Sequence, residues 1–137
     1  MMRILLDTNV VLDVLLNREP WVIEAKALWQ AHEDGNLVGY LTASTLTDIF
    51  YVARRLTSLD LAYRAIRLCF DTFEICPVDR QTLSLALNLP GTDFEDNLQV
   101  ACARLTGLDA VVTRNSEDFK DAPVAILSPA EVLVQLK

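Results

Sequence analysis

A short apolar strand leads straight into a helix at residues 3–13, which read RILLDTNVVLD. Residues 4–6 are predicted to form a strand that ends at Asp7. Residues 8–16 are predicted to form a helix, because apolar side chains recur at helical spacing and Thr8 and Asn9 suit a helix N-terminus. A strand followed at once by a helix is typical of the βαβ units that build parallel sheets.

The same alternation continues along the rest of the chain. Further strands are expected at residues 38–41, within 73–78, at 110–113 and at 124–127. Between and after these strands the pattern predicts helices. Ser44 or Thr45 is expected to cap the helix after the second strand, and Thr92 or Asp93 the helix that ends at Gly107. We therefore predict an α/β fold: a single domain over residues 1–137, with a three-layer α/β/α architecture and a mostly parallel five-stranded sheet.

Composition narrows the function classes. The chain has 137 residues, of which 52% are hydrophobic and 23% charged, enough for one sizeable core. Its net charge of −7 argues against holding nucleic acid by bulk charge alone. Three cysteines without a CxxC pair and a single histidine argue against a zinc site. With no signal peptide and no membrane-spanning run, we expect a soluble cytoplasmic protein that does not enter a membrane.

Acidic residues follow the predicted strands. They are Asp7, Asp13, Asp48, Asp93, Asp96 and Asp118, with Asn115 near the last of them. Some also have structural interpretations: Asp93 and Asp118 suit helix caps, and Asp13 suits a bond to a neighbouring loop. Ligands of parallel sheets bind beyond the carboxyl ends of the strands, where most of these residues fall. Carboxylates that converge there need a hard cation such as Mg²⁺ or Mn²⁺, which suits phosphoryl transfer or phosphodiester hydrolysis.

Four segments together resemble the motifs of the PIN-domain nucleases. They are residues 6–13 (LDTNVVLD), 44–52 (STLTDIFYV), 93–103 (DFEDNLQVACA) and 113–119 (TRNSEDF). The order and spacing of all four match, so the resemblance covers the whole chain. It is strongest to the VapC-like toxin ribonucleases of toxin–antitoxin pairs. It implies an Mg²⁺- or Mn²⁺-dependent endoribonuclease that hydrolyses RNA with metal-activated water, forms a homodimer and is inhibited by a small cognate antitoxin.

The resemblance also implies roles for individual residues. Asp7, Asp48 and Asp96 would bind the metal, and Asp118 would join them as a catalytic acid. Two departures matter: Asp48 stands where many members carry Glu, and Asn115 where many carry Asp. The fourth metal ligand is therefore open between Asp118, Asp93 and Asn115. The resemblance further implies that Thr8 and Asn9 position the loop around Asp7. It implies that Thr113 hydrogen-bonds to the groups that hold the metal.

Basic residues are candidates for contacts to RNA. Arg114 lies beside the proposed acids and is expected to hold a substrate phosphate. Arg54 and Arg55, with Arg64 and Arg67 on the next helix, form either a solvated surface or a contact to RNA or a partner.

Other function classes remain open. A receiver-like signalling domain also needs acids after its first strand, but it needs an Asp after the third strand, where this chain has Cys76-Pro77. An Asp-nucleophile phosphatase needs an acid two positions after the first, where this chain has Asn9. A catalytically impaired PIN-like domain that binds RNA or protein as a scaffold is the third alternative.

Overall fold

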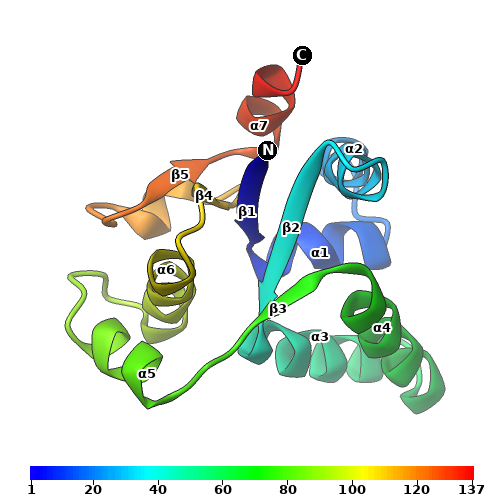
Figure 1. The fold of residues 1–137 in the computed structure, drawn as a ribbon. Coiled ribbons are helices and arrows are strands. Elements are labelled where there is room, and N and C mark those ends of the chain that lie inside the picture. The colour runs from blue at the N-terminus through cyan, green and yellow to red at the C-terminus, as the bar shows by residue number, and fades with distance from the viewer.

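Five parallel strands form the centre of the molecule. The computed structural model describes residues 1–137 and orders the strands β3-β2-β1-β4-β5, with every neighbouring pair parallel (Figure 1). The strands are β1 (Met2–Leu6), β2 (Leu37–Thr42), β3 (Glu74–Cys76), β4 (Ala110–Val112) and β5 (Ala125–Leu127). The predicted α/β/α architecture is confirmed, and the sheet is parallel throughout.

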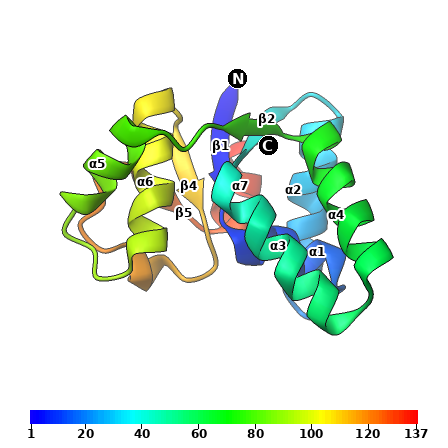
Figure 2. The same cartoon turned by 90° about the horizontal axis from the view of Figure 1, so that it is seen from below.

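Helices cover both faces of this sheet (Figure 2). They are α1 (Thr8–Leu15), α2 (Val22–Glu33), α3 (Ala43–Leu56), α4 (Leu59–Thr72), α5 (Arg80–Leu87), α6 (Phe94–Thr106) and α7 (Pro129–Gln135). Alternate β1 side chains point to opposite faces. Ile4 and Leu6 pack in the larger core with α1–α4 and α7, whereas Leu5 packs against α6. None of the helices combines the length and the apolar composition that a membrane crossing requires.

Residues next to the helix termini determine where the helices begin and end. Asp93 caps α6 by accepting a hydrogen bond from the Asp96 backbone, and Gly107 ends that helix with a φ of +72°. The cap of α3 differs from the prediction of Ser44 or Thr45. Thr42 fills that role, because its Oγ1 accepts a hydrogen bond of 3.0 Å from the Thr45 backbone. The helix therefore begins directly at the end of β2.

The strand order places a crevice beside β1. From β1 the chain proceeds outward through β2 and β3 on one side, and β4 and β5 lie on the other side. Such a reversal of direction leaves a crevice at the carboxyl ends of the central strands, where α/β proteins bind ligands. Asp7 lies at this point, immediately after β1 and before α1. The topology thus brings the end of β1 close to residues from both halves of the chain.

Candidate functional site at the carboxyl edge of the sheet

A cleft of about 350 Å³ opens at this edge. We call it the acidic cleft, because acidic and other polar side chains form most of its wall. Its lining consists of Asp7, Thr8, Asn9, Leu12, Asp48, Tyr51, Val52, Arg55, Asp93, Glu95, Asp96, Gln99, Asn115 and Asp118. The structure therefore brings together all the predicted metal ligands and fourth-ligand candidates, although the sequence separates the first from the last by more than a hundred residues.

Asp7 is held rigidly at the base of the cleft. Its side chain is buried, with only 6% of the residue exposed. The Thr113 hydroxyl donates to Asp7 Oδ2 over 2.8 Å, and Gln99 Nε2 donates to Asp7 Oδ1 over 3.0 Å. Thr113 Oγ1 in turn accepts a hydrogen bond from the Asn115 backbone. No basic side chain makes a salt bridge to Asp7, so only neutral donors stabilise its carboxylate.

Asp96 experiences a strongly negative environment at the first turn of α6. Partial burial raises the pKa of its carboxyl group to about 7, and repulsion from Asp93, Asp7 and Asp118 contributes to the same shift. Asp93 is thus both the cap of α6 and a wall of the cleft, so the structural and functional interpretations of this residue coexist. The acids therefore lie close enough to destabilise one another's charge.

Glu95 also belongs to this group, and the sequence did not single it out. A hydrogen bond between the carboxyl groups of Glu95 and Asp48 raises the pKa of Glu95 to about 8. Burial and the charges of Asp48, Asp93 and Asp96 raise this pKa further. The signal available in the sequence was the run DFED at residues 93–96, in which three of four side chains are acidic.

Arg55 is the basic side chain that lines the acidic cleft. It lies on α3 seven residues after Asp48, and this spacing of two helical turns places both on one face of the helix. Tyr51 lies between them on the same face and also lines the cleft. The adjacent Arg54 is exposed and does not contribute to the lining. Of the four arginines on α3 and α4, only Arg55 is therefore placed to meet a ligand in the cleft.

Arg114, which was expected to hold a phosphate, lies outside the lining. Its Nε donates to Asp13 Oδ2 over 2.9 Å, and its guanidinium lies 4.0 Å from the centre of the Trp21 ring. Asp13 is almost completely buried and also meets Arg18 at 3.7 Å. Asp13 therefore has a structural role, because it binds Arg114 in the loop after β4. Trp21 itself is 43% exposed, with the Arg114 guanidinium over its ring.

The chemistry of the lining fits a hard divalent cation. Every candidate ligand is an oxygen from a carboxylate, amide or hydroxyl group, as Mg²⁺ and Mn²⁺ prefer. Gln99 Oε1 is also buried without a hydrogen-bond partner, which is costly for an amide oxygen, by about 1–3 kcal/mol. No three acidic side chains are already arranged as a group that could hold an ion. The cleft therefore suits a divalent cation by the type and charge of its oxygen donors, and not by a ligand geometry that is already formed.

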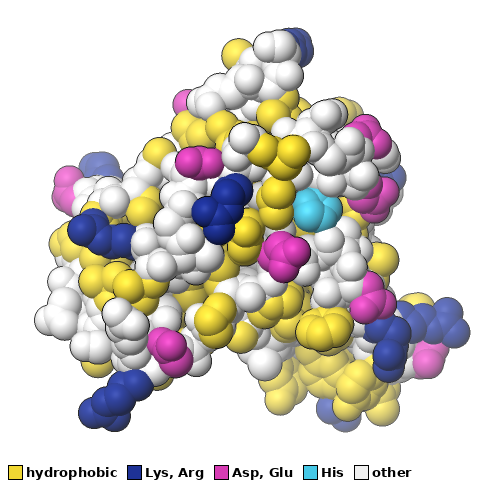
Figure 3. Space-filling model, viewed as in Figure 1, with side chains coloured by type: hydrophobic (Ala, Val, Ile, Leu, Met, Phe, Trp, Pro, Cys, Tyr) yellow, Lys and Arg dark blue, Asp and Glu magenta, His cyan; other side chains and the backbone are white.

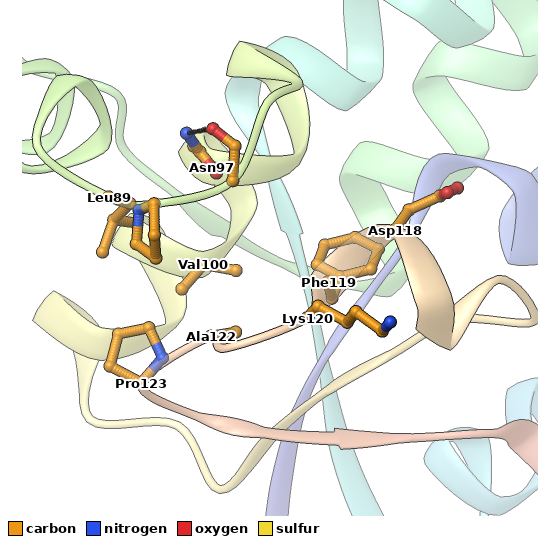
Figure 4. A pocket seen from close by; sticks show the side chains of 10 residues that line it. Leu89, Asn97, Val100, Asp118, Phe119, Lys120, Ala122 and Pro123 are labelled. Carbon is orange, nitrogen blue, oxygen red and sulfur yellow. Dashed lines mark hydrogen bonds between the residues drawn. The ribbon is translucent and has the colours of Figure 1, made fainter.

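A second, much smaller cavity adjoins the cleft and shares Asp118 with it (Figure 4). It lies between α6 and the segment after β4, and its volume of about 10 Å³ suits about one water molecule. Asn97 borders it and donates from Nδ2 to the Gly91 carbonyl over 2.9 Å, tying the loop before α6 to the helix. This cavity is too small for a substrate.

An apolar groove runs between α3 and α4. Leu46, Thr47, Phe50, Tyr51, Tyr63 and Ile66 line it, and its volume is about 270 Å³. The rings of Phe50 and Tyr63 meet edge to face with their centres 5.0 Å apart. Hydrophobic side chains also reach the surface over these two helices at the lower right of Figure 3. Tyr51 lines both this groove and the acidic cleft, so the two adjoin at this side chain.

Comparison with known proteins gives one sequence match and many structural ones. The family model of the PIN domain matches residues 3–117. No curated protein sequence matches the chain. Among solved structures, the DNA-bound VapBC of Salmonella typhimurium is 18% identical, with a TM-score of 0.72, and the match covers 94% of this chain and 99% of that one.

Two further solved structures show the same fold. A toxin–antitoxin complex from Klebsiella pneumoniae is 24% identical, with a TM-score of 0.67 and coverage of 91% of this chain and 96% of that chain. VapC20 of Mycobacterium tuberculosis, a toxin that cleaves the sarcin–ricin loop, is 18% identical. Its TM-score is 0.62, and the match covers 79% of this chain and 86% of that one.

Proposed function

We propose, from the premise that this chain belongs to the PIN-domain family, that it is a metal-dependent endoribonuclease and the toxin of a toxin–antitoxin pair. The acidic cleft is the observation that carries this proposal. Six acidic residues line this one cleft, with Arg55 as their basic neighbour. They are Asp7 at the end of β1, Asp48 on α3, Asp93, Glu95 and Asp96 at the start of α6, and Asp118 after β4. So many unpaired negative charges in one place destabilise the folded state, whereas they would bind a cation strongly.

Asp7, Asp48 and Asp96 are proposed to hold Mg²⁺ or Mn²⁺. When bound, the ion lowers the pKa of a water molecule and neutralises charge that develops on the phosphate. Thr113 and Gln99 hold the Asp7 carboxylate in place through its two oxygens, and Thr8 and Asn9 line the cleft beside it. Asp93, Asn115 and Asp118 all border the cleft and remain the candidates for a fourth ligand.

An RNA phosphodiester is the proposed substrate. A chain of net charge −7 repels a polyanion, so productive binding requires positive charge at the cleft itself. We assign this role to Arg55 together with the ion. Arg114 is already engaged by Asp13 and Trp21, so it is not proposed for this role. The sarcin–ricin loop cleavage ascribed to VapC20 agrees with this substrate class.

A small antitoxin is the proposed partner. Similar structures are toxin–antitoxin complexes, and the groove between α3 and α4 offers an apolar surface that this chain does not cover. Since the groove and the acidic cleft adjoin at Tyr51, a partner segment that binds in the groove would need to extend only past this side chain to reach the cleft. A basic side chain on that segment would complement the acids and block the site. A homodimer, as the resemblance implies, remains a separate prediction to be tested by light scattering.

The decisive experiment is cleavage of RNA by purified protein. The wild type should cut a structured RNA with Mn²⁺ or Mg²⁺ and should be inactive in EDTA. Asp7→Asn and Asp96→Asn should each abolish cleavage while their circular dichroism spectra stay native, because each change removes a charge at nearly constant volume. Metal-dependent cleavage at near wild-type rate by either variant would reject the assignment. Folded wild-type protein that binds RNA without cutting it would instead support the scaffold alternative.

A further inference from the structure

Gln99 is the polar side chain in the acidic cleft whose presence is hardest to explain by folding alone. It lies on α6, three residues after Asp96, on the part of the helix that faces the sheet. Only 2% of the residue is exposed. Apolar or small residues surround it on the same stretch of helix, among them Leu98, Val100 and Ala101. An apolar side chain at this position would satisfy the core without any polar partner.

The two ends of the Gln99 amide have different surroundings. Nε2 donates to Asp7 Oδ1 over 3.0 Å, whereas Oε1 has no hydrogen-bond partner although it is buried. This is the only buried side-chain polar atom in the molecule without a partner. Rotating the amide by half a turn would place Oε1 against the Asp7 oxygen, acceptor to acceptor, so the bond to Asp7 fixes the orientation.

Gln99 also lines the cleft that holds the proposed metal ligands. Its side chain is therefore a neutral amide in a wall that otherwise offers mainly carboxylates, and Oε1 is the acceptor of that amide that no protein group uses. A neutral amide can bind a hydrated cation without adding to the repulsion that already raises the pKa of Asp96. The bond from Nε2 meanwhile stops Asp7 from rotating, so its free lone pairs keep a constant direction.

We propose that Gln99 is a positioning residue of the metal centre: it orients Asp7 through Nε2 and accepts a hydrogen bond at Oε1 from water bound to the divalent ion. This inference rests on the proposed function, because it assumes that the cleft binds a cation. It goes further by assigning a task to a residue that matches none of the acidic positions. Residues that support metal ligands in this way commonly change metal affinity 10–100-fold when they are removed.

The test compares Mn²⁺ binding with stability in the metal-free protein. Gln99→Leu and Gln99→Met replace the amide by apolar groups of similar size, so one of the two is available if the other folds poorly. Both should weaken Mn²⁺ binding about 10-fold or more by electron paramagnetic resonance titration. Their melting temperature in EDTA should stay near that of the wild type, because removal of the unpartnered oxygen offsets loss of the hydrogen bond to Asp7.

Asn97→Leu is the matched control, since Asn97 is a second buried amide on α6 whose donor goes to Gly91 instead of Asp7. It should lower the melting temperature in EDTA and leave Mn²⁺ affinity within about twofold of the wild type, as expected for a change outside the metal's surroundings. A structural role for Gln99 would give that same pattern in the two Gln99 variants and would overturn the proposal. Wild-type affinity in both Gln99 variants would also overturn it.

A measurement on the wild type needs no folded variant. Titration with Mg²⁺ should shift the side-chain amide resonances of Gln99 in a ¹⁵N spectrum and leave those of Asn97 in place. An unmoved Gln99 resonance in a protein that demonstrably binds the ion would refute the Gln99 role while leaving the proposed function intact. Failure of the wild type to bind either ion would reject both.

Discussion

Glu95 and Asp48 face each other across the acidic cleft and share a hydrogen bond between their carboxyl groups. Glu95 belongs to the first turn of α6 and Asp48 to the second turn of α3, so this contact joins helices from opposite faces of the sheet. Two carboxyl groups can share a hydrogen bond only when one of them keeps its proton, which is why the pKa of Glu95 rises to about 8. The metal-free protein therefore carries a titratable link across its proposed active site.

The first prediction concerns pH. Glu95 and Asp96 have pKa values raised from 4.5 and 3.8 to about 8 and about 7. The folded chain keeps protons that the unfolded chain has already lost, so the free energy of unfolding should fall as the pH rises from about 4 to about 8. Urea unfolding in EDTA at several pH values measures this dependence.

Glu95→Gln should flatten that pH dependence, because the amide can donate to Asp48 at every pH. The control is Glu24→Gln on α2, which lies outside the cleft and should keep the wild-type slope. Metal-free wild-type protein whose stability rises between pH 5 and pH 8 would show that the acids do not repel one another as described.

The second prediction separates two neighbouring arginines. Arg55→Ala should weaken RNA binding and raise KM by about 10-fold, because a charge-assisted hydrogen bond to phosphate contributes about 1.5 kcal/mol. Arg54→Ala removes the same charge from the same helix without touching the cleft and should change KM less than twofold. Equal effects of the two substitutions at several salt concentrations would indicate a diffuse electrostatic contribution instead of a specific contact.

The third prediction concerns Arg114, whose ion pair with buried Asp13 gives it a structural role. Arg114→Ala should lower the free energy of unfolding by about 2 kcal/mol, less than for a fully buried pair because Arg114 is partly exposed. Arg18→Ala, which removes the longer contact of 3.7 Å to the same carboxylate, should cost under about 1 kcal/mol. RNA cleavage per folded molecule should stay near wild type in both. A loss of cleavage in Arg114→Ala with full stability would instead favour a phosphate contact.

The fourth prediction concerns the partner surface. Tyr63→Ser should weaken the complex with the product of a small neighbouring reading frame, co-expressed and co-purified with this chain, because Tyr63 lines the apolar groove. Phe70→Ser is the control, since Phe70 is equally exposed on α4 but lies outside the groove. Complexes of equal affinity with both variants would place the partner elsewhere.

Local sequence signals predicted the fold well because they act over short distances. The strand ending at Asp7, the Asp93 cap and the end of α6 at Gly107 each depend on a few adjacent residues. The wrong assignment of the α3 cap has the same origin: Thr42, Ser44 and Thr45 all suit a cap, and only the end of β2 decides among them.

The site could be predicted only in part. The aspartates could be predicted as site residues because they follow the predicted strands in the sequence. Gln99 and Glu95 become part of the cleft only because α6 packs beside β1 and faces α3, which is a tertiary contact. Arg114 shows the opposite case. It stands beside the acids in sequence, yet the buried charge of Asp13 draws it away from the cleft. Long-range ion pairs of this kind leave no periodic pattern in a sequence.

Thermal melting of the wild type and Asp96→Asn, each in EDTA and in Mn²⁺, tests most directly whether the acidic cleft is a metal site. At a hundredfold excess over its dissociation constant, Mn²⁺ should stabilise the wild type by about 2.7 kcal/mol, or roughly 10 °C. Asp96→Asn should melt at or above the wild-type temperature in EDTA, because it relieves repulsion, and should lose most of the Mn²⁺ shift. An Asp96→Asn protein that is less stable in EDTA, yet gains as much from Mn²⁺ as the wild type, would contradict the metal site.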